Sequence, residues 1–201
     1  MTNTIHPREK LIQTAAALVH KQGWTATGIN QILSEAGIPK GSFYYYFRSK
    51  EALGVAVLQY HCTNLKQLLD KTLMSADLAA DTAIYELLKE LSTTHHETGY
   101  RLGCPIGSFA NEIATQSPQL LAEAKTGLRL YEESWIALIE KGQKEGSISP
   151  QIEAGEVGKV ASMLLQGAFL SMKGCGNAAP LELAQACIYN LLFGQSVASR
   201  S

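Results

Sequence analysis

The sequence lacks the cysteine patterns that form metal sites and disulfide frameworks. Zinc modules and small disulfide-rich folds need cysteines, or cysteines and histidines, at short regular spacings. The chain has no Cys-x-x-Cys pair and no histidines at zinc-ligand spacing, and its four cysteines are far apart: Cys62, Cys104, Cys175 and Cys187. We therefore expect free thiols in a reducing compartment, with neither a metal nor another cofactor.

Long hydrophobic runs are absent as well. The apolar runs are only a few residues long, whereas a membrane-spanning helix needs about 20. Residues 1–10 are polar and contain no apolar segment of the kind that a secretory signal requires. Hydrophobic residues nevertheless make up 46% of the chain, which is enough for a sizeable core. We expect a cytoplasmic protein without a membrane partner.

A recognisable catalytic constellation is also missing. His95, His96 and Glu97 are adjacent, and His61 precedes Cys62, but none of them has the spacing of a nucleophile–base pair or of metal ligands. Adjacent residues on a helix point about 100° apart, so two neighbouring histidines do not converge on one metal. We expect no enzyme activity.

Charge is unevenly distributed, although the net charge is only −1. Residues 1–50 hold six lysines and arginines against two acidic residues, a net charge of +4. Residues 51–201 hold eleven against sixteen, a net charge of −5. A basic segment attached to an acidic one suits a polyanionic partner at one end of the chain.

Hydrophobic residues recur with a helical period almost throughout, and no segment alternates as a strand does. The chain contains no internal repeat and no low-complexity linker. These patterns predict an all-α fold with two domains. Residues 1–50 form a three-helix head that carries a helix-turn-helix, and residues 51–201 form a larger helical body.

Residues 27–47 carry the helix-turn-helix pattern. Pro7 begins a first helix that Gly23 ends, and Thr27 is predicted to be the N-cap of a short second helix. A turn centred on Gly37 leads into a brief third helix, and Ser49 caps a long fourth one. Two short helices joined by a glycine-centred turn are typical of DNA-binding proteins.

The segment from Thr27 to Leu53 resembles the DNA-binding region of the TetR family of repressors. That family's pattern is a threonine cap, an Ala-Gly-aliphatic turn and then Gly-x-x-Tyr-x-Tyr/His-Phe-x-x-Lys-x-x-Leu, and every position is matched here. The resemblance covers about residues 8–55. It implies a ligand-responsive repressor that binds a palindromic operator in double-stranded DNA as a homodimer, and that a small-molecule or electrophile effector releases.

An architectural DNA-binding protein without an effector is the alternative. The long body with its aromatic residues argues against it, because coating DNA requires only the head.

The predicted DNA contacts follow from how a helix enters the major groove, with its first residues toward the base edges. Lys40 is placed to donate to guanine, Ser42 to a base or a phosphate, and the tyrosine hydroxyls to phosphates. The competing interpretation is that the tyrosines belong to the core of the head. Three consecutive residues cannot all face inward on one helix, so this can hold for only some of them. The predicted DNA-binding residues are Thr27, Lys40, Gly41, Ser42, Tyr44, Tyr45, Tyr46 and Lys50.

The resemblance further implies that the last two helices, about residues 153–173 and 180–195, pair with those of a second subunit in a four-helix bundle. Both helices have a wide apolar stripe, which could instead pack within one subunit. The predicted interface residues are Val157, Val160, Leu164, Leu165, Ala168, Leu191 and Leu192.

An effector pocket in the body should combine aromatic walls with a few polar groups. The residues predicted to line it, which could equally be ordinary core, are Cys104, Phe109, Tyr131, Trp135, Met163, Gln166 and Phe169.

The segment that begins Gly103-Cys104-Pro105 is similar to a motif in one branch of the family, in which some members have a cysteine that reacts with electrophiles or oxidants. Pro105 fits the first position of a helix, which would make Cys104 its N-cap. Backbone N–H groups and the helix dipole there favour a thiolate. An inert buried cysteine is the competing interpretation.

Overall fold

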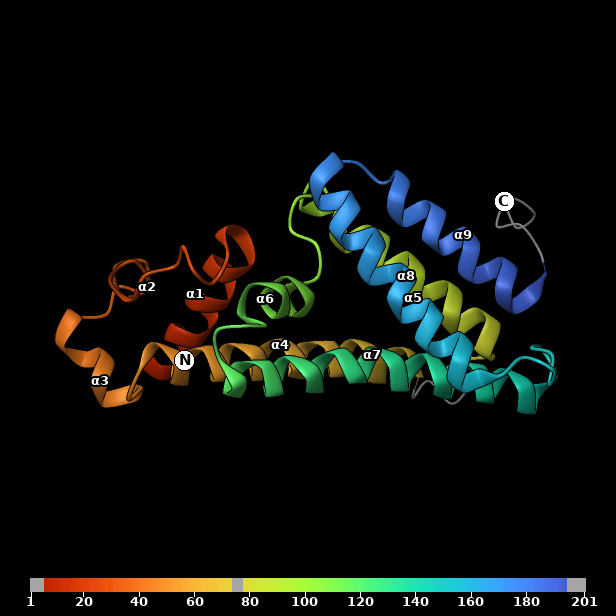
Figure 1. Cartoon of the computed structure of the whole chain (residues 1–201), viewed down its shortest axis with the longest axis horizontal. Coiled ribbons are helices and arrows are strands. Elements are labelled where there is room, and N and C mark those ends of the chain that lie inside the picture. Colours follow the sequence, from red (N-terminus) through yellow and green to blue (C-terminus); the bar gives the residue numbers. More distant parts are fainter. Residues whose placement is uncertain (1–5, 74–77, 195–201) are drawn as a thin grey trace, which may run out of the picture. The chain divides into compact units, whose positions relative to one another are not determined.

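The computed structural model describes residues 6–73 and 78–194, and it contains only helices, turns and loops over that part of the chain (Figure 1). The all-α prediction is therefore confirmed. The elements are α1 (Pro7–Gln22), α2 (Ile29–Ala36), the 3-10 helix η1 (Lys40–Ser42), α3 (Phe43–Tyr46), α4 (Lys50–Leu73), α5 (Ala80–Glu97), α6 (Pro105–Ile113), α7 (Pro118–Glu145), α8 (Ala154–Cys175) and α9 (Ala179–Phe193).

The chain divides into two compact units. The first unit consists of the chain up to Leu65 together with Pro105–Leu128, and the second of Lys66–Cys104 together with the chain from Arg129 onward. By packing, α6 and parts of α4 and α7 thus belong with α1–α3. The boundary between residues 50 and 51 concerns function and stays a prediction.

Proline and glycine delimit the first helices as predicted. α1 begins at Pro7, and the Arg8 N–H donates to Nδ1 of the capping His6 at 3.3 Å. It ends at Gly23, where φ is 92°, a conformation that residues with a Cβ rarely adopt. α2 ends at Gly37 in the left-handed conformation, with a φ of 63°.

The start of α2 differs from the prediction. Its N-cap is Gly28, which makes no side-chain cap, and not Thr27. The Thr27 side chain is buried and its hydroxyl donates to the Gly23 carbonyl at 2.6 Å. The hydroxyl therefore links the two ends of the loop between α1 and α2, and the predicted N-cap role of Thr27 is wrong.

One hydrophobic core holds the first unit together. Side chains from α1, α2, α3, α4, α6 and α7 meet in it, and the largest fully buried ones include Phe43, Phe109, Leu11, Ile32 and Leu33. Burying each such side chain contributes about 1.5–3 kcal/mol. This core fixes α2, η1 and α3 on α1 and α4.

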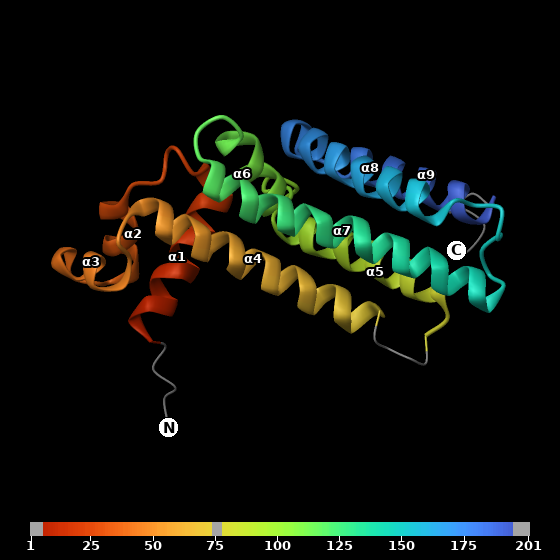
Figure 2. The same ribbon diagram turned by 60° about the horizontal axis from the view of Figure 1, so that its bottom comes forward.

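The second unit is built from α5, α8, α9 and the later parts of α4 and α7, and its largest buried side chains are Trp135 and Phe169. α7 and α8 approach closely at Gly158, where a Cβ would lie 2.6 Å from Cγ1 of Ile136. α8 and α9 lie side by side, as Figures 1 and 2 both show, and they contact one another extensively. None of the described helices is long and apolar enough to cross a membrane.

Candidate functional site

The short helix α3 separates its aromatic residues between the core and the surface. Phe43 is fully buried and Phe47, which directly follows the helix, is 4% exposed. Tyr44 and Tyr45 are 73% and 84% exposed, and Tyr46 is half-buried, with its ring 6.1 Å from that of His6. The phenylalanines thus supply the core, which leaves two tyrosines exposed on the surface.

η1 comes directly before α3 and supplies the other predicted base-reading groups. Lys40 and Gly41 are exposed and Ser42 is half-buried. A Cβ added to Gly41 would meet nothing within 4 Å, so the backbone is open to a large partner there. Lys40, Gly41, Ser42 and the exposed tyrosines therefore follow one another along a single surface segment.

Lys50, which is among the predicted DNA contacts, is held by its own chain. Its Nζ donates to the Trp24 carbonyl at 2.9 Å and lies 4.3 Å from the centre of the indole ring. Burial lowers the pKa of the Lys50 ammonium, and the charge of Glu112 partly opposes that shift. The TetR pattern predicts a lysine at position 50, but it does not predict the contacts of that lysine with Trp24.

Sequence reasoning also missed two residues next to α3. The Arg8 guanidinium lies 5.1 Å from the centre of the Phe47 ring, and Arg48 is exposed immediately after it. Both arginines contribute to the positive charge of residues 1–50, and this charge was the one sequence feature that could have pointed to them.

Three of the predicted effector-pocket residues contact one another in the second unit. The buried Cys104 thiol lies 3.8 Å from the Tyr131 hydroxyl, and the Gln166 side-chain amide donates to Cys104 Sγ at 3.5 Å. Trp135 and Phe169 are buried in the same unit, and the Phe169 ring lies 4.7 Å from that of His95. A thiol, a phenol and an amide thus meet in the second unit.

The other two predicted pocket residues lie elsewhere. Phe109 belongs to the first unit, where its ring lies 5.0 Å from that of Trp24. Met163 is 62% exposed on α8, on the side that faces away from the core. α8 is apolar on two sides, and sequence periodicity does not tell which of them a methionine occupies.

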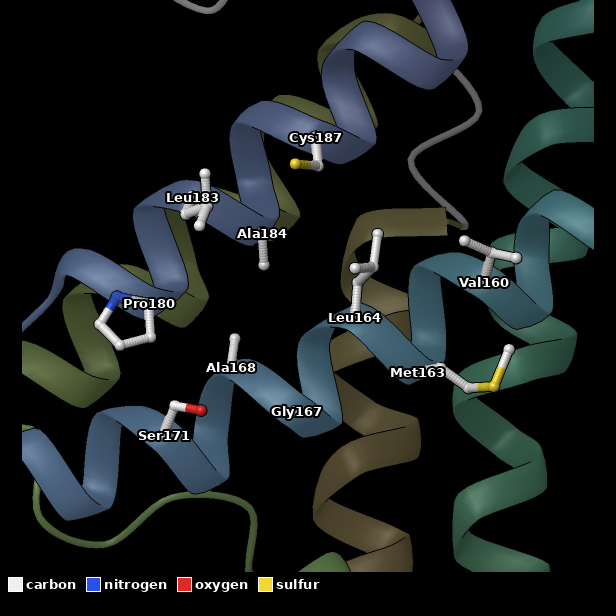
Figure 3. Close-up of a pocket in the computed structure, with 10 residues that line it drawn as sticks. All are labelled: Val160, Met163, Leu164, Gly167, Ala168, Ser171, Pro180, Leu183, Ala184 and Cys187. Carbon is white, nitrogen blue, oxygen red and sulfur yellow. The ribbon is translucent and has the colours of Figure 1, made fainter.

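A shallow apolar groove of about 540 Å³ runs between α8 and α9 (Figure 3). Ala168 and Ala184 face one another across it, and their small size leaves it open. The residues that line it are Val160, Met163, Leu164, Gly167, Ala168, Ser171, Pro180, Leu183, Ala184 and Cys187.

The predicted interface residues divide between this groove and the core. Val160, Leu164 and Ala168 line the groove, Val157 is half-buried, and Leu191 is 46% exposed on α9. Leu165 and Leu192 are 0% and 3% exposed, so they pack inside their own subunit. On α8 and α9, two further apolar residues that were not predicted at the interface are exposed, Leu170 at 71% and Leu183 at 67%.

Among the described residues, no group of three or more histidine, cysteine or acidic side chains is placed to hold a metal ion.

Two family patterns match the chain. That of the bacterial regulatory proteins of the tetR family matches residues 11–57, and that of the LmrA/YxaF-like transcriptional regulators, C-terminal domain, matches residues 79–187. The second pattern covers the body, where the sequence alone had offered only analogy.

Known proteins are similar over nearly the whole chain. The uncharacterized HTH-type transcriptional regulator YxaF of Bacillus subtilis (strain 168) is 31% identical over 85% of this chain and 86% of its own length. The HTH-type transcriptional repressor NemR of Escherichia coli (strain K12) is 30% identical over 92% and 93%. The crystal structure of E. coli NemR in its reduced form is 28% identical and covers 95% of this chain and 100% of that one, with a TM-score of 0.85. The chain therefore belongs to the TetR family of bacterial transcriptional regulators.

Proposed function

We propose that this protein is a cytoplasmic, ligand-responsive repressor that binds a palindromic operator as a homodimer. DNA binding is assigned to residues 1–50, and effector binding and dimerisation to residues 51–201. The observation that carries the proposal is the exposure of Tyr44 and Tyr45 on α3, beside Phe43 and Phe47, which already fill the core. Two adjacent tyrosines exposed on a basic surface suit a large anionic partner.

In the proposed complex, η1 and α3 enter the major groove. Lys40 donates to acceptors on guanine, and Ser42 reaches a base or a phosphate. The open backbone at Gly41 allows a close approach to the duplex. The hydroxyls of the three tyrosines donate to phosphates and fix the register without reading sequence. Thr27 and Lys50, which bond to the α1–α2 loop, support the head from inside.

The groove between α8 and α9 is proposed to receive the same two helices of a second copy. An isolated subunit would leave Met163, Leu170 and Leu183 in water, each more than 60% exposed. Self-association of this face about a two-fold axis buries all of them and forms a four-helix bundle. A dimer also supplies two recognition helices, which a palindromic operator requires.

The cluster of Cys104, Tyr131 and Gln166 is proposed as the effector site. The Tyr131 hydroxyl and the Gln166 amide both lie within contact distance of the buried Cys104 thiol, and a few polar groups beside an aromatic ring are typical of small-molecule sites. A thiol in such a site also suits an electrophile. The crystal structure of the relative NemR is of a reduced form, which favours testing Cys104 first.

A selection experiment tests the proposal. Random double-stranded DNA is incubated with the purified full-length protein, and bound duplexes are recovered and sequenced over several rounds. The proposal predicts enrichment of a two-fold symmetric sequence, bound at least about 10³-fold more tightly than random DNA at physiological salt. Electrophiles and apolar small molecules are then screened for release of that duplex. Enrichment without any symmetric motif would favour the architectural alternative, and no enrichment would contradict both.

A further inference from the structure

The loop between α1 and α2 is held by a carboxylate from α6, far away in the sequence. The Thr25 N–H donates to Glu112 Oε2 at 3.0 Å. The same carboxylate lies against Gly23, where an added Cβ would be 2.6 Å from Oε1. Figures 1 and 2 both show α6 beside α1, and the two helices contact one another.

Glu112 also acts on the lysine that grips this loop. Lys50 donates to the Trp24 carbonyl and lies over the indole, while the charge of Glu112 opposes the effect of burial on the Lys50 pKa. Phe109 is one turn before Glu112 on α6 and packs its ring 5.0 Å from Trp24. One face of α6 therefore meets the loop with an aromatic ring and a carboxylate.

The loop determines where the helix-turn-helix begins. Thr27 N–H donates to the Trp24 carbonyl at 3.2 Å, and its hydroxyl donates to Gly23, which leads directly into the cap of α2 at Gly28. We propose that Glu112 is a positioning residue for DNA binding, because it holds the α1–α2 loop and Lys50 in the arrangement in which η1 and α3 meet the operator. This inference rests on the proposed function.

A purely electrostatic role for Glu112 predicts the opposite result. A carboxylate near a DNA-binding surface repels phosphates, so its removal should leave DNA affinity unchanged or raise it. Loss of a positioning contact should lower affinity instead, without changing the number of phosphates that the protein neutralises. The sign of the effect therefore separates the two roles.

The experiment uses the full-length protein and a fluorescent duplex selected by the wild type from random DNA. We expect Glu112→Ala to weaken binding about tenfold, the size of one hydrogen bond to a charged group, with an unchanged slope against salt concentration. Glu112→Gln keeps an oxygen acceptor for Thr25 N–H and should fall between Glu112→Ala and wild type. The matched control is Glu123→Ala, which removes a carboxylate from α7 in the same unit. The Glu123 carboxylate accepts a hydrogen bond from the Gln59 amide, and its removal should cost no affinity.

Circular dichroism and thermal unfolding accompany each variant. Equal or tighter binding by a folded Glu112→Ala would overturn the inference and leave the proposed function intact. If Glu112→Ala does not fold, Glu112→Gln must still bind more weakly than Glu123→Ala, and equal affinity of these two would overturn the inference. Failure of the wild type to select any duplex contradicts the proposed function, and the inference with it.

Discussion

His61 on α4 should make the stability of the protein fall in mild acid. Its Nε2 is buried and has no hydrogen-bond partner among the described residues, and its ring lies 6.0 Å from that of His20. Burial, and secondarily the charge of His20, lower the pKa of His61 from 6.5 to about 4. The unfolded chain therefore binds a proton in a pH range in which the folded chain does not.

The sign and size of the effect follow from linkage. Because the folded-state pKa is the lower one, the unfolding free energy is unaffected above about pH 6.5 and falls as the pH drops toward 4. At about 1.36 kcal/mol per pKa unit, the full loss is about 3 kcal/mol, and about 2.5 kcal/mol of it should be reached at pH 4.5.

Urea unfolding at pH 7 and pH 4.5, at one protein concentration, measures the loss. Carboxylates also titrate in this range, so the wild type is compared with His61→Phe, which keeps a buried ring and removes the titration. The variant should lose less stability between the two pH values, by about 2.5 kcal/mol. His96→Phe alters an exposed histidine on α5 and should behave as wild type. An identical pH dependence of His61→Phe and wild type would show that the loss of stability does not come from His61.

Four further predictions concern the surfaces and the core. Lys40→Ala should weaken binding to the selected operator by about 1–3 kcal/mol and relax its specificity in a fluorescence titration, and an equal loss on random DNA would remove Lys40 from base reading. Leu183→Glu should yield monomers in sedimentation and abolish tight operator binding, whereas Tyr85→Glu, which charges another exposed apolar site, should stay dimeric. Gly54→Ala should lower the unfolding free energy by about 1–3 kcal/mol, because the added Cβ would lie 2.7 Å from the Trp24 ring. At an unobstructed helix position the same change raises stability, and such a gain here would contradict the prediction. Cys104 should be alkylated faster than Cys62 at neutral pH despite its burial, and Cys104→Ser should stay on the operator when an electrophile is added; equal labelling would leave Cys104 an inert core residue.

The fold was predictable where single residues have strong local effects. Gly23 and Gly37 end helices because each adopts a positive φ, and Ser49 caps α4 by accepting a hydrogen bond from the Ala52 N–H at 3.0 Å. The predicted ends of the last two helices lie within two residues of those of α8 and α9. The predicted N-cap at Thr27 was wrong because a threonine hydroxyl there can bond either to a backbone N–H in the first turn of α2 or to the Gly23 carbonyl. The local sequence pattern does not choose between these two partners.

Side-chain partners distant in the sequence were not predictable. Glu112 and Thr25 are 87 positions apart, and neither the period of α6 nor its composition indicates that its acidic residue turns toward the first loop. The two apolar sides of α8 could not be told apart for the same reason. The periodicity of the sequence showed a wide apolar stripe on this helix, but not which part of the stripe faces the core. Leu165 was therefore expected at the dimer interface and is fully buried, while Leu170 was overlooked and is exposed.

The stoichiometry and spacing of the DNA complex test the central claim most directly. Native mass spectrometry of the full-length protein on its selected duplex, together with footprinting, gives both. We expect two chains, or a multiple of two, on each palindrome, with half-site centres one helical turn apart, about 10–10.5 base pairs, or a near multiple of it. One chain per duplex, or protection without symmetric half-sites, would contradict it.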